Sequence, residues 1–386
     1  MYNEFFYSNE RKGLWTKEML LLSLSNLFLY ISLYIYLPTL PFWLSDKYDC
    51  SLIQGTLVLA TFAVAIFIPG PFNNYLLDAF KRKNVAFWSS AFLSMAAIGY
   101  LGATSLIIVL ALRIIQGLLF SIITTTTSST LVIDVTPTTK RTLANLFFTR
   151  IGRFGMIIGV IVGVYLYNIY DMILVFYISA ALTLLSGILV LFIRVPFRAP
   201  LKPSLLSLDR FLLPRVLPAA FNMIACPIII GILITIVELN VYFLFLISGF
   251  ILGFVLVHIL FKNLESKREL EMSTLFSIIG FLMFTFTSSI FISLAGFILL
   301  GIGLSISANR FYVMIISLPH HCERGSANNT YNLIWELGIS TGVVIGFYFD
   351  GLDTTKFFIS ISIMLISLLV YEFKIHKWYY RLMDDK

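Results

Sequence analysis

Ionisable residues inside long apolar stretches are the first candidates for chemistry in this sequence. Glu336 is the only acid deep within such a stretch, and four arginines share that setting: Arg113, Arg150, Arg153 and Arg310. A buried carboxyl is driven towards protonation by desolvation and back towards ionisation by a nearby cation. We therefore predict that Glu336 exchanges a proton, with Arg113 or Arg153 shifting its proton affinity. A static bond from the carboxylate to an arginine or a hydroxyl is the structural alternative.

A second candidate set combines an amide with two phenols. Asn26, Tyr30 and Tyr34 follow one another at intervals of four residues. In a helix this spacing puts all three side chains on one face. Such a face suits an amphipathic organic ligand, because it offers apolar rings with a few polar groups. Ordinary aromatic packing between helices is the alternative reading.

Enzyme chemistry and metal binding find little support. The run His320-His321-Cys322-Glu323 could not easily converge on one ion from a single short loop, and the sequence holds no second cluster. No nucleophile with a base and an orienting group is recognisable, and no phosphate-binding G-x-x-x-x-G-K-[ST] loop occurs. The sequence therefore predicts neither an enzyme nor a cofactor.

Only membrane-spanning helices can position these residues. The chain has 386 residues, of which 59% are hydrophobic and 12% charged, and its mean hydropathy is +0.93. Soluble domains hold about 45–50% apolar and about 25% charged residues. The composition therefore indicates an all-α polytopic membrane protein, and apolar runs of about 20 residues predict its spans. We predict twelve transmembrane helices, at 18–44, 53–77, 85–102, 105–133, 145–167, 172–193, 217–237, 241–261, 272–287, 290–316, 327–349 and 356–373.

The distribution of positive charge predicts the orientation. With both termini in the cytoplasm, 21 of the 27 Lys and Arg residues fall on the cytoplasmic side, and only Lys47 and Lys356 fall outside. Cytoplasmic loops collect Lys and Arg, so this orientation is strongly favoured. The net charge of +7 then reflects orientation and contact with anionic membrane lipids rather than a nucleic-acid partner.

An internal repeat divides the predicted helices into halves. At a constant offset of 183 residues, R141-T-L-A-N145 superposes on R324-G-S-A-N328. The same offset superposes two glycine series, whose small residues allow close helix packing. We expect two pseudo-symmetric six-helix bundles, at 1–193 and 217–386, joined by a cytoplasmic linker at 194–216. The glycines predicted to form helix seams are Gly155, Gly159, Gly163, Gly338, Gly342 and Gly346.

Two motifs carry a family resemblance. The segment N74-Y-L-L-D78-A-F-K81-R82-K83 resembles the G-x-L-x-D-R-x-G-R-R signature of the major facilitator superfamily (MFS), matching at Leu76, Asp78, Arg82 and Lys83 and departing at Asn74, Ala79 and Lys81. The segment R113-I-I-Q116-G117 is similar to a motif of the superfamily's drug/proton antiporters.

The resemblance implies a fold, a cavity and a conformational latch. In this superfamily two parallel six-helix halves alternate around a central site. Helices at the positions of 18–44, 105–133, 217–237 and 290–316 line that site, which places Arg113, Gln116 and Arg310 near the substrate together with Asn26, Tyr30 and Tyr34. The predicted latch consists of Asp78, Arg82, Lys83 and Asp134. Simple helix capping by these acids is the alternative.

The function expected is secondary active transport of a small organic solute by alternating access. We predict proton-coupled efflux of amphipathic compounds, by a protein of the cell (inner) membrane that works as a monomer. Proton symport or uniport uptake of a sugar or organic anion is the first alternative. The excess of arginine over acid within the spans favours an anionic solute if the arginines face the cavity. A transporter-like membrane sensor that moves nothing is the alternative of another class.

Overall fold

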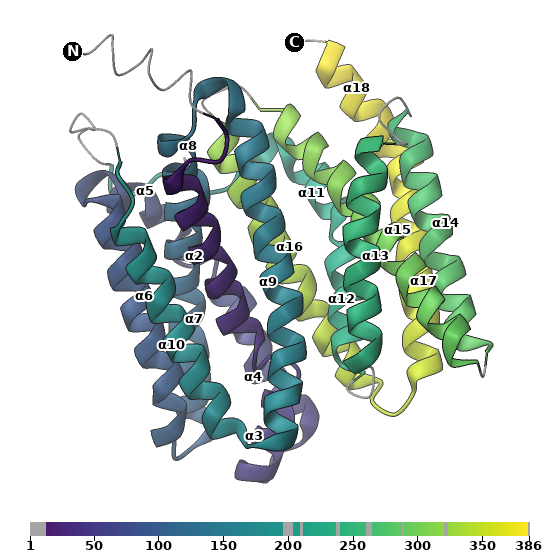
Figure 1. Cartoon of the computed structure of the whole chain (residues 1–386), viewed down its shortest axis with the longest axis horizontal. Coiled ribbons are helices and arrows are strands. Elements are labelled where there is room, and N and C mark those ends of the chain that lie inside the picture. The colour runs from purple at the N-terminus through teal and green to yellow at the C-terminus, as the bar shows by residue number, and fades with distance from the viewer. Residues whose placement is uncertain are drawn as a thin grey trace. The chain divides into compact units, whose positions relative to one another are not determined.

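All regular structure in the described residues is helical. The computed structural model describes residues 13–195, 204–208, 211–236, 240–259, 265–287, 289–319 and 323–384 (Figure 1). The run His320-His321-Cys322-Glu323, for which no metal site is predicted, lies outside the described residues except for Glu323. The all-α class is confirmed.

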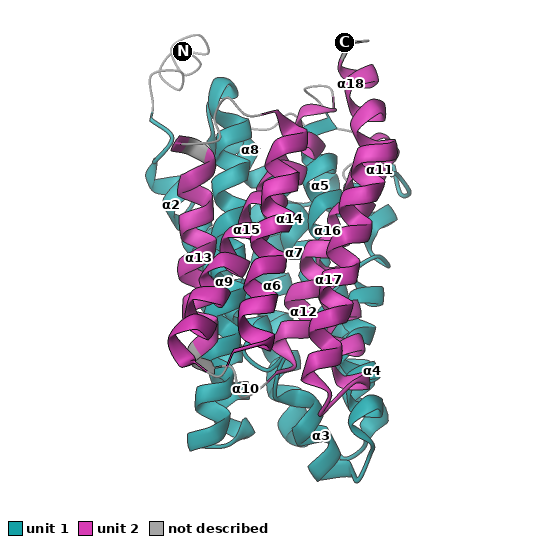
Figure 2. Ribbon diagram, turned by 90° about the vertical axis from the view of Figure 1, so that its right-hand side faces the viewer, with its two compact units in different colours: residues 1–213, 320–333 teal, residues 214–319, 334–386 magenta. Residues whose placement is uncertain are grey.

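The chain divides into two compact units (Figure 2). Unit 1 comprises Met1–Leu213 with His320–Leu333, and unit 2 comprises Pro214–Pro319 with Ile334–Lys386. The helices of unit 1 are α2 (Lys17–Tyr34), α3 (Leu40–Tyr48), α4 (Leu52–Ala65), α5 (Gly70–Ala79), α6 (Arg82–Gly99), α7 (Leu106–Thr126), α8 (Val132–Val135), α9 (Arg141–Ile169) and α10 (Met172–Leu191). Those of unit 2 are α11 (Leu217–Met223), α12 (Ala225–Ile234), α13 (Asn240–Ile259), α14 (Ser266–Thr285), α15 (Ile290–Ser317), α17 (Asp353–Val370) and α18 (His376–Asp384).

Helix α16 (Arg324–Tyr348) belongs to both units, because its first ten residues are grouped with unit 1. The contact-defined boundary at Leu213 falls inside the linker predicted at 194–216. The division into two six-helix bundles, at 1–193 and 217–386, remains a prediction.

The described residues contain six helices that are long and apolar enough to cross a membrane, or eight if two bent pairs each form one span. The bent pairs are α4 with α5, at 52°, and Pro214–Met223 with α12, at 42°. Asn328, Asn329 and Asn332 lower the apolar content of α16, which is not among the six. A multi-pass membrane protein follows, while the number twelve remains a prediction.

Prolines break two of the predicted continuous spans. The first span, predicted at 18–44, is divided into α2 and α3 around Pro38. The second is divided into α4 and α5, where Pro69 and Pro71 flank Gly70. Proline cannot donate a backbone hydrogen bond and its ring clashes with the preceding turn, so each helix bends or stops there. A hydropathy pattern alone does not register these bends.

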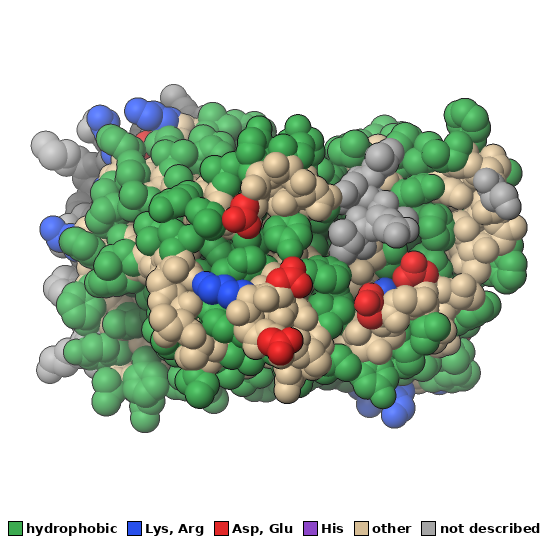
Figure 3. Space-filling view, turned by 90° about the horizontal axis from the view of Figure 1, so that it is seen from below, with side chains coloured by type: hydrophobic (Ala, Val, Ile, Leu, Met, Phe, Trp, Pro, Cys, Tyr) green, Lys and Arg blue, Asp and Glu red, His purple; other side chains and the backbone are tan. Residues whose placement is uncertain are grey.

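Within unit 1, α2 packs against α9 and α10, and α7 packs against α4 and α6. Within unit 2, α15 packs against α13 and α14. The face seen in Figure 3 is mostly hydrophobic, with a few acidic and basic side chains scattered over it.

The glycine series of unit 1 forms a close seam between α9 and α2. A Cβ placed on Gly155 would come within 2.7 Å of the Leu27 carbonyl oxygen, and one on Gly159 within 2.7 Å of the Ile31 oxygen. At Gly163 a Cβ would overlap the carbonyl of Ile35. The seam therefore exists inside unit 1, and its service as a rocking surface between halves remains a prediction.

The second glycine series forms the corresponding seam in unit 2. Gly338 lies against Pro227, where a Cβ would come within 2.5 Å of the proline ring. Gly342 lies against Ile228 and Gly346 against Thr235. Both series thus join the penultimate helix of a predicted half to the first helix of that half, as the sequence repeat implies.

Gly159→Ala is expected to destabilise the protein by about 1–3 kcal/mol, because its methyl group would force α9 away from α2. The added Cβ would meet the Ile31 Cα at 3.1 Å as well as its carbonyl oxygen. Thermal unfolding in detergent measures the loss. Gly102→Ala is the matched control, since its Cβ would meet nothing within 4 Å. Equal melting temperatures for the two variants would contradict a close α2–α9 seam.

Candidate functional site

Arg113 lies buried in the middle of an aromatic and amide cluster of unit 1. Its side chain comes from α7 and the residue is only 2% exposed. The guanidinium lies 5.2 Å from the ring centre of Tyr36 and 5.3 Å from that of Phe62. Arg113 Nη1 donates to Gln116 Oε1 at 3.0 Å, and Tyr100 OH donates to the same oxygen at 2.8 Å. The R-x-x-Q-G motif thus places a guanidinium cation against two aromatic rings, with the Gln116 amide oxygen as its hydrogen-bond acceptor.

Arg153 forms a second cation–aromatic cluster in unit 1. Its guanidinium lies 5.5 Å from the ring centres of both Tyr30, on α2, and Tyr331, on α16. Arg153 Nη2 also donates to Asn332 Oδ1 at 3.0 Å. Cation–π contacts gain strength when the cation is desolvated, and Arg153 is 2% exposed.

The amide and phenols predicted on one face of the first helix are all buried. Asn26 Nδ2 donates to the Phe148 carbonyl of α9 at 2.8 Å. Tyr30 and Tyr34 stack with ring centres 6.1 Å apart, and Tyr30 meets Phe120 edge-on at 5.5 Å. The three residues therefore share a face, as predicted, and in this structure they are engaged in helix packing. Their contact with a solute remains a prediction.

The structure brings together two of the four predicted latch residues. Arg82, at the start of α6, forms an ion pair with Asp134 of α8. Lys83 instead donates to the carbonyls of Leu191 and Ile193, both at 2.8 Å, and so satisfies the end of α10. Asp78 lies near the end of α5, and its part in the latch remains a prediction.

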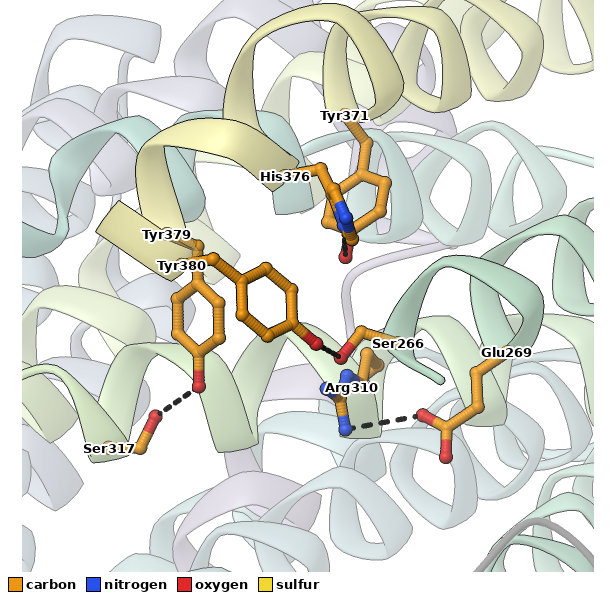
Figure 4. Close-up of polar contacts among 8 residues, drawn as sticks. All are labelled: Ser266, Glu269, Arg310, Ser317, Tyr371, His376, Tyr379 and Tyr380. Atoms are coloured by element: carbon orange, nitrogen blue, oxygen red, sulfur yellow. Dashed lines mark hydrogen bonds and ion pairs between the residues drawn. The ribbon is translucent and has the colours of Figure 1, made fainter. Parts of the chain in front are cut away.

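In unit 2, Arg310 of α15 faces an acid rather than standing alone. Its Nη1 lies 3.5 Å from Glu269 Oε2 of α14, and the Glu269 side chain is 7% exposed (Figure 4). The sequence reading missed Glu269, because it began the ninth span at 272 while α14 begins at Ser266. The signal in the sequence is the charged run Lys267-Arg268-Glu269, which lies just before the apolar stretch of the predicted ninth span.

The same end of unit 2 holds the C-terminal helix in place. Tyr380 of α18 and Ser266 share a hydrogen bond of 3.1 Å, and Tyr379 and Ser317 share one of 2.9 Å (Figure 4). These bonds join α18 to the first residue of α14 and the last residue of α15. A helix rich in Lys, Arg and Tyr is thus fixed beside the Arg310–Glu269 pair.

Glu336 lies in the part of α16 that belongs to unit 2 and is 3% exposed. Its predicted partner Arg153 belongs to unit 1. The described residues contain no group of three or more His, Cys, Asp or Glu side chains that could hold a metal ion.

Comparisons with known proteins identify the family. The model of the Major Facilitator Superfamily matches residues 22–343. No curated protein matches the sequence significantly. Among solved structures, the human organic anion transporter MFSD10 (TETRAN) is similar at a TM-score of 0.67 and 12% identity, over 92% of this chain and 98% of that one.

Two bacterial structures are similar to the same degree. A bacterial homologue of the iron transporter ferroportin, in an outward-facing state, gives a TM-score of 0.66 at 15% identity, over 93% of this chain and 98% of that one. A bacterial homologue of the human lysosomal transporter Spinster, inward-facing and unoccupied, gives 0.66 at 14% identity, over 95% and 97%. At these identities the structures support the fold alone.

The chain belongs to the major facilitator superfamily. It is accordingly a polytopic membrane protein and a secondary transporter of small molecules rather than an enzyme, and the predicted fold is confirmed.

Proposed function

We propose that the protein exports amphipathic organic compounds in exchange for protons, by alternating access. The observation that carries this proposal is the setting of Arg113, buried between Tyr36 and Phe62 with the Gln116 amide as its acceptor. On insertion scales a charge at mid-bilayer costs about 2.5–3.5 kcal/mol, and such charges usually face the bundle interior or a water-filled cavity and mark a functional site. Aromatic faces around a cation also suit a ligand with rings or alkyl chains and few polar groups.

Proton coupling is assigned to Glu336, with Arg113 and Arg153 tuning its proton affinity. Burial raises the energy of an ionised carboxylate and a positive charge lowers it, so binding of solute near these groups can release or take up a proton. We further propose that both termini face the cytoplasm, that the protein resides in the cell (inner) membrane, and that it works as a monomer.

Transport of an organic anion is the second candidate, and the Arg113 setting favours it. Among the described residues the charge of Arg113 meets amide and aromatic groups, with no carboxylate recorded as its partner. An anionic solute would supply the missing negative charge. The similar human transporter is described as an organic anion transporter, which supports the same candidate.

Reconstituted vesicles test the proposal. A pH gradient is imposed on proteoliposomes, pools of lipophilic cations, sugars and organic acids are added in turn, and a dye reports internal pH. Solute-dependent proton movement with one pool is the expected result and identifies the solute class. Silence with every pool, from folded protein, would overturn proton-coupled export.

Glu336→Gln is expected to abolish the solute-dependent proton movement, because an amide cannot exchange a proton with the solute site. Glu271→Gln is the matched control, since the Glu271 side chain is 43% exposed and lies beside Lys267. Proton movement of wild-type size and pH dependence in the Glu336 variant would remove this residue from the coupling mechanism.

A further inference from the structure

Among the described linker residues of unit 1, Phe211 is buried, whereas three leucines shortly before it are exposed. Phe211 is 6% exposed, whereas Leu205, Leu206 and Leu208 are 60%, 62% and 61% exposed. The Phe211 ring meets Phe67 edge-on, with ring centres 6.3 Å apart. The linker therefore inserts the Phe211 side chain at the bend between α4 and α5.

Gly70 makes room for this ring. A Cβ placed on Gly70 would overlap three carbons of the Phe211 ring. Gly70 is the first residue of α5 and lies between Pro69 and Pro71, where the helix pair bends by 52°. Any larger residue at this position would force the ring to move, so the bend and the linker are sterically matched.

The backbone beside Phe211 is bound to the start of α16. Asn329 Nδ2 donates to the Phe211 carbonyl at 3.1 Å, and the Leu213 amide donates to Thr330 Oγ1 at 2.9 Å. We call Phe211 and Leu213, with Gly70, Asn329 and Thr330, the linker clip. All five residues belong to unit 1.

A buried chain of hydrogen bonds connects the linker clip back to α5. Asn73 Nδ2 of α5 donates to Thr125 Oγ1 of α7 at 3.1 Å, and Thr125 Oγ1 donates to Asn329 Oδ1 at 3.2 Å. Asn73 lies one helical turn after Gly70, the residue against which the Phe211 ring packs. The path thus runs from α5 through α7 and α16 to the linker and back to α5.

We propose that the linker clip is a conformational lock that holds the first turns of α16 on unit 1 and opens during the transport cycle. Helix α16 contributes Arg324–Leu333 to unit 1 and its remainder to unit 2. Alternating access moves the two halves of such a transporter against each other. A helix shared by both units cannot keep all of these contacts through the movement, and the clip decides how readily they release.

Ser129 offers a reporter that is independent of the solute. It lies in the π-helical turn Thr127–Leu131, and a Cβ on Gly325 of α16 would come within 2.8 Å of its carbonyl oxygen. The residue is 5% exposed, and its hydroxyl has no hydrogen-bond partner among the described residues. Ser129→Cys therefore removes no bond, and its thiol becomes reachable when the start of α16 leaves unit 1.

The experiment measures maleimide labelling of Ser129→Cys in lipid nanodiscs, in a background with Cys50, Cys226 and Cys322 replaced by Ser. Phe211→Ala is expected to raise the labelling rate by about tenfold or more, since burying a phenylalanine shifts an equilibrium by at least that factor. Gly70→Ala is expected to do the same by displacing the ring. Leu208→Ala and Gly102→Ala are the matched controls.

Folding is checked by gel filtration and melting temperature, and Phe211→Leu, which keeps an apolar side chain of similar size, is expected to restore most of the protection. Labelling that rises no more in Phe211→Ala and Gly70→Ala than in the two controls would overturn the lock. So would labelling of the parent protein as fast as that of a fully exposed cysteine. The labelling rate and the melting temperature depend neither on proton coupling nor on the solute. A failure of the lock can therefore be distinguished from a failure of the proposed function.

Discussion

Replacement of Arg82 by Gln is expected to slow solute transport about tenfold, because an ion pair or charged hydrogen bond of this kind is worth about 1.5–3 kcal/mol. Arg82 pairs with Asp134, and the two side chains are 13% and 23% exposed. Without the pair, the conformer that it stabilises is less populated and the cycle slows. Flux in proteoliposomes measures the effect, and Arg82→Lys, which keeps the charge, is the control.

The helix dipoles make a charge swap informative. Arg82 begins α6, and Asp134 is the last residue but one of the continuous helical span Leu106–Val135, so each charge meets the unfavourable end of its helix. The double variant Arg82→Asp with Asp134→Arg keeps the pair and puts each charge at the favourable end, worth about 0.3–1 kcal/mol apiece. We expect it to melt at a higher temperature than wild type and still to transport more slowly, because the latch is then too tight.

Two results would contradict this account. Wild-type flux in Arg82→Gln would show that the pair is no latch. A charge swap that restores full flux without added stability would show that only the pairing matters and that the dipoles contribute nothing.

Arg113→Ala is expected to lower transport by about a hundredfold, because it removes a buried charge from an apolar helix, where charges usually mark functional sites. Arg113→Lys is expected to remain defective. A lysine ammonium is a compact point charge and cannot reproduce the flat guanidinium that lies over Tyr36 and Phe62. Full activity of the Lys variant would show that the charge matters and the stacking does not.

Gln116→Glu separates the two candidate solute classes. The new carboxylate would accept from Arg113 at the position of Gln116 Oε1, now 3.0 Å from Nη1, with little change of shape. If Arg113 attracts an anionic solute, this internal counter-charge competes with it, and anion flux falls while flux of amphipathic cations persists. Equal loss of both fluxes would favour a role for Arg113 in coupling rather than in solute recognition.

The Phe211 contact and the Glu269–Arg310 pair show where sequence reading stops. The prolines and charges of 194–216 predicted a linker, and nothing in their pattern distinguished Phe211 from the leucines around it. Its site is made by Gly70 and Asn329, and the Asn329–Phe211 hydrogen bond joins residues 118 positions apart. Arg310 was predicted to face the substrate, but its partner Glu269 lay just outside the predicted ninth span and so was not considered.

The sequence by itself determined the all-helical class, the membrane class, the repeat and the close-packed faces of Gly155, Gly159 and Gly163. These properties are local or periodic: apolar runs must form helices in lipid, because no water satisfies their backbone groups there. Small residues spaced four apart necessarily form one face. Only the tertiary structure decided which charges pair. Arg82 forms an ion pair with Asp134, and Lys83 donates to a carbonyl at the end of α10. That choice depends on which helix ends meet in space, and residue spacing along one chain does not contain it.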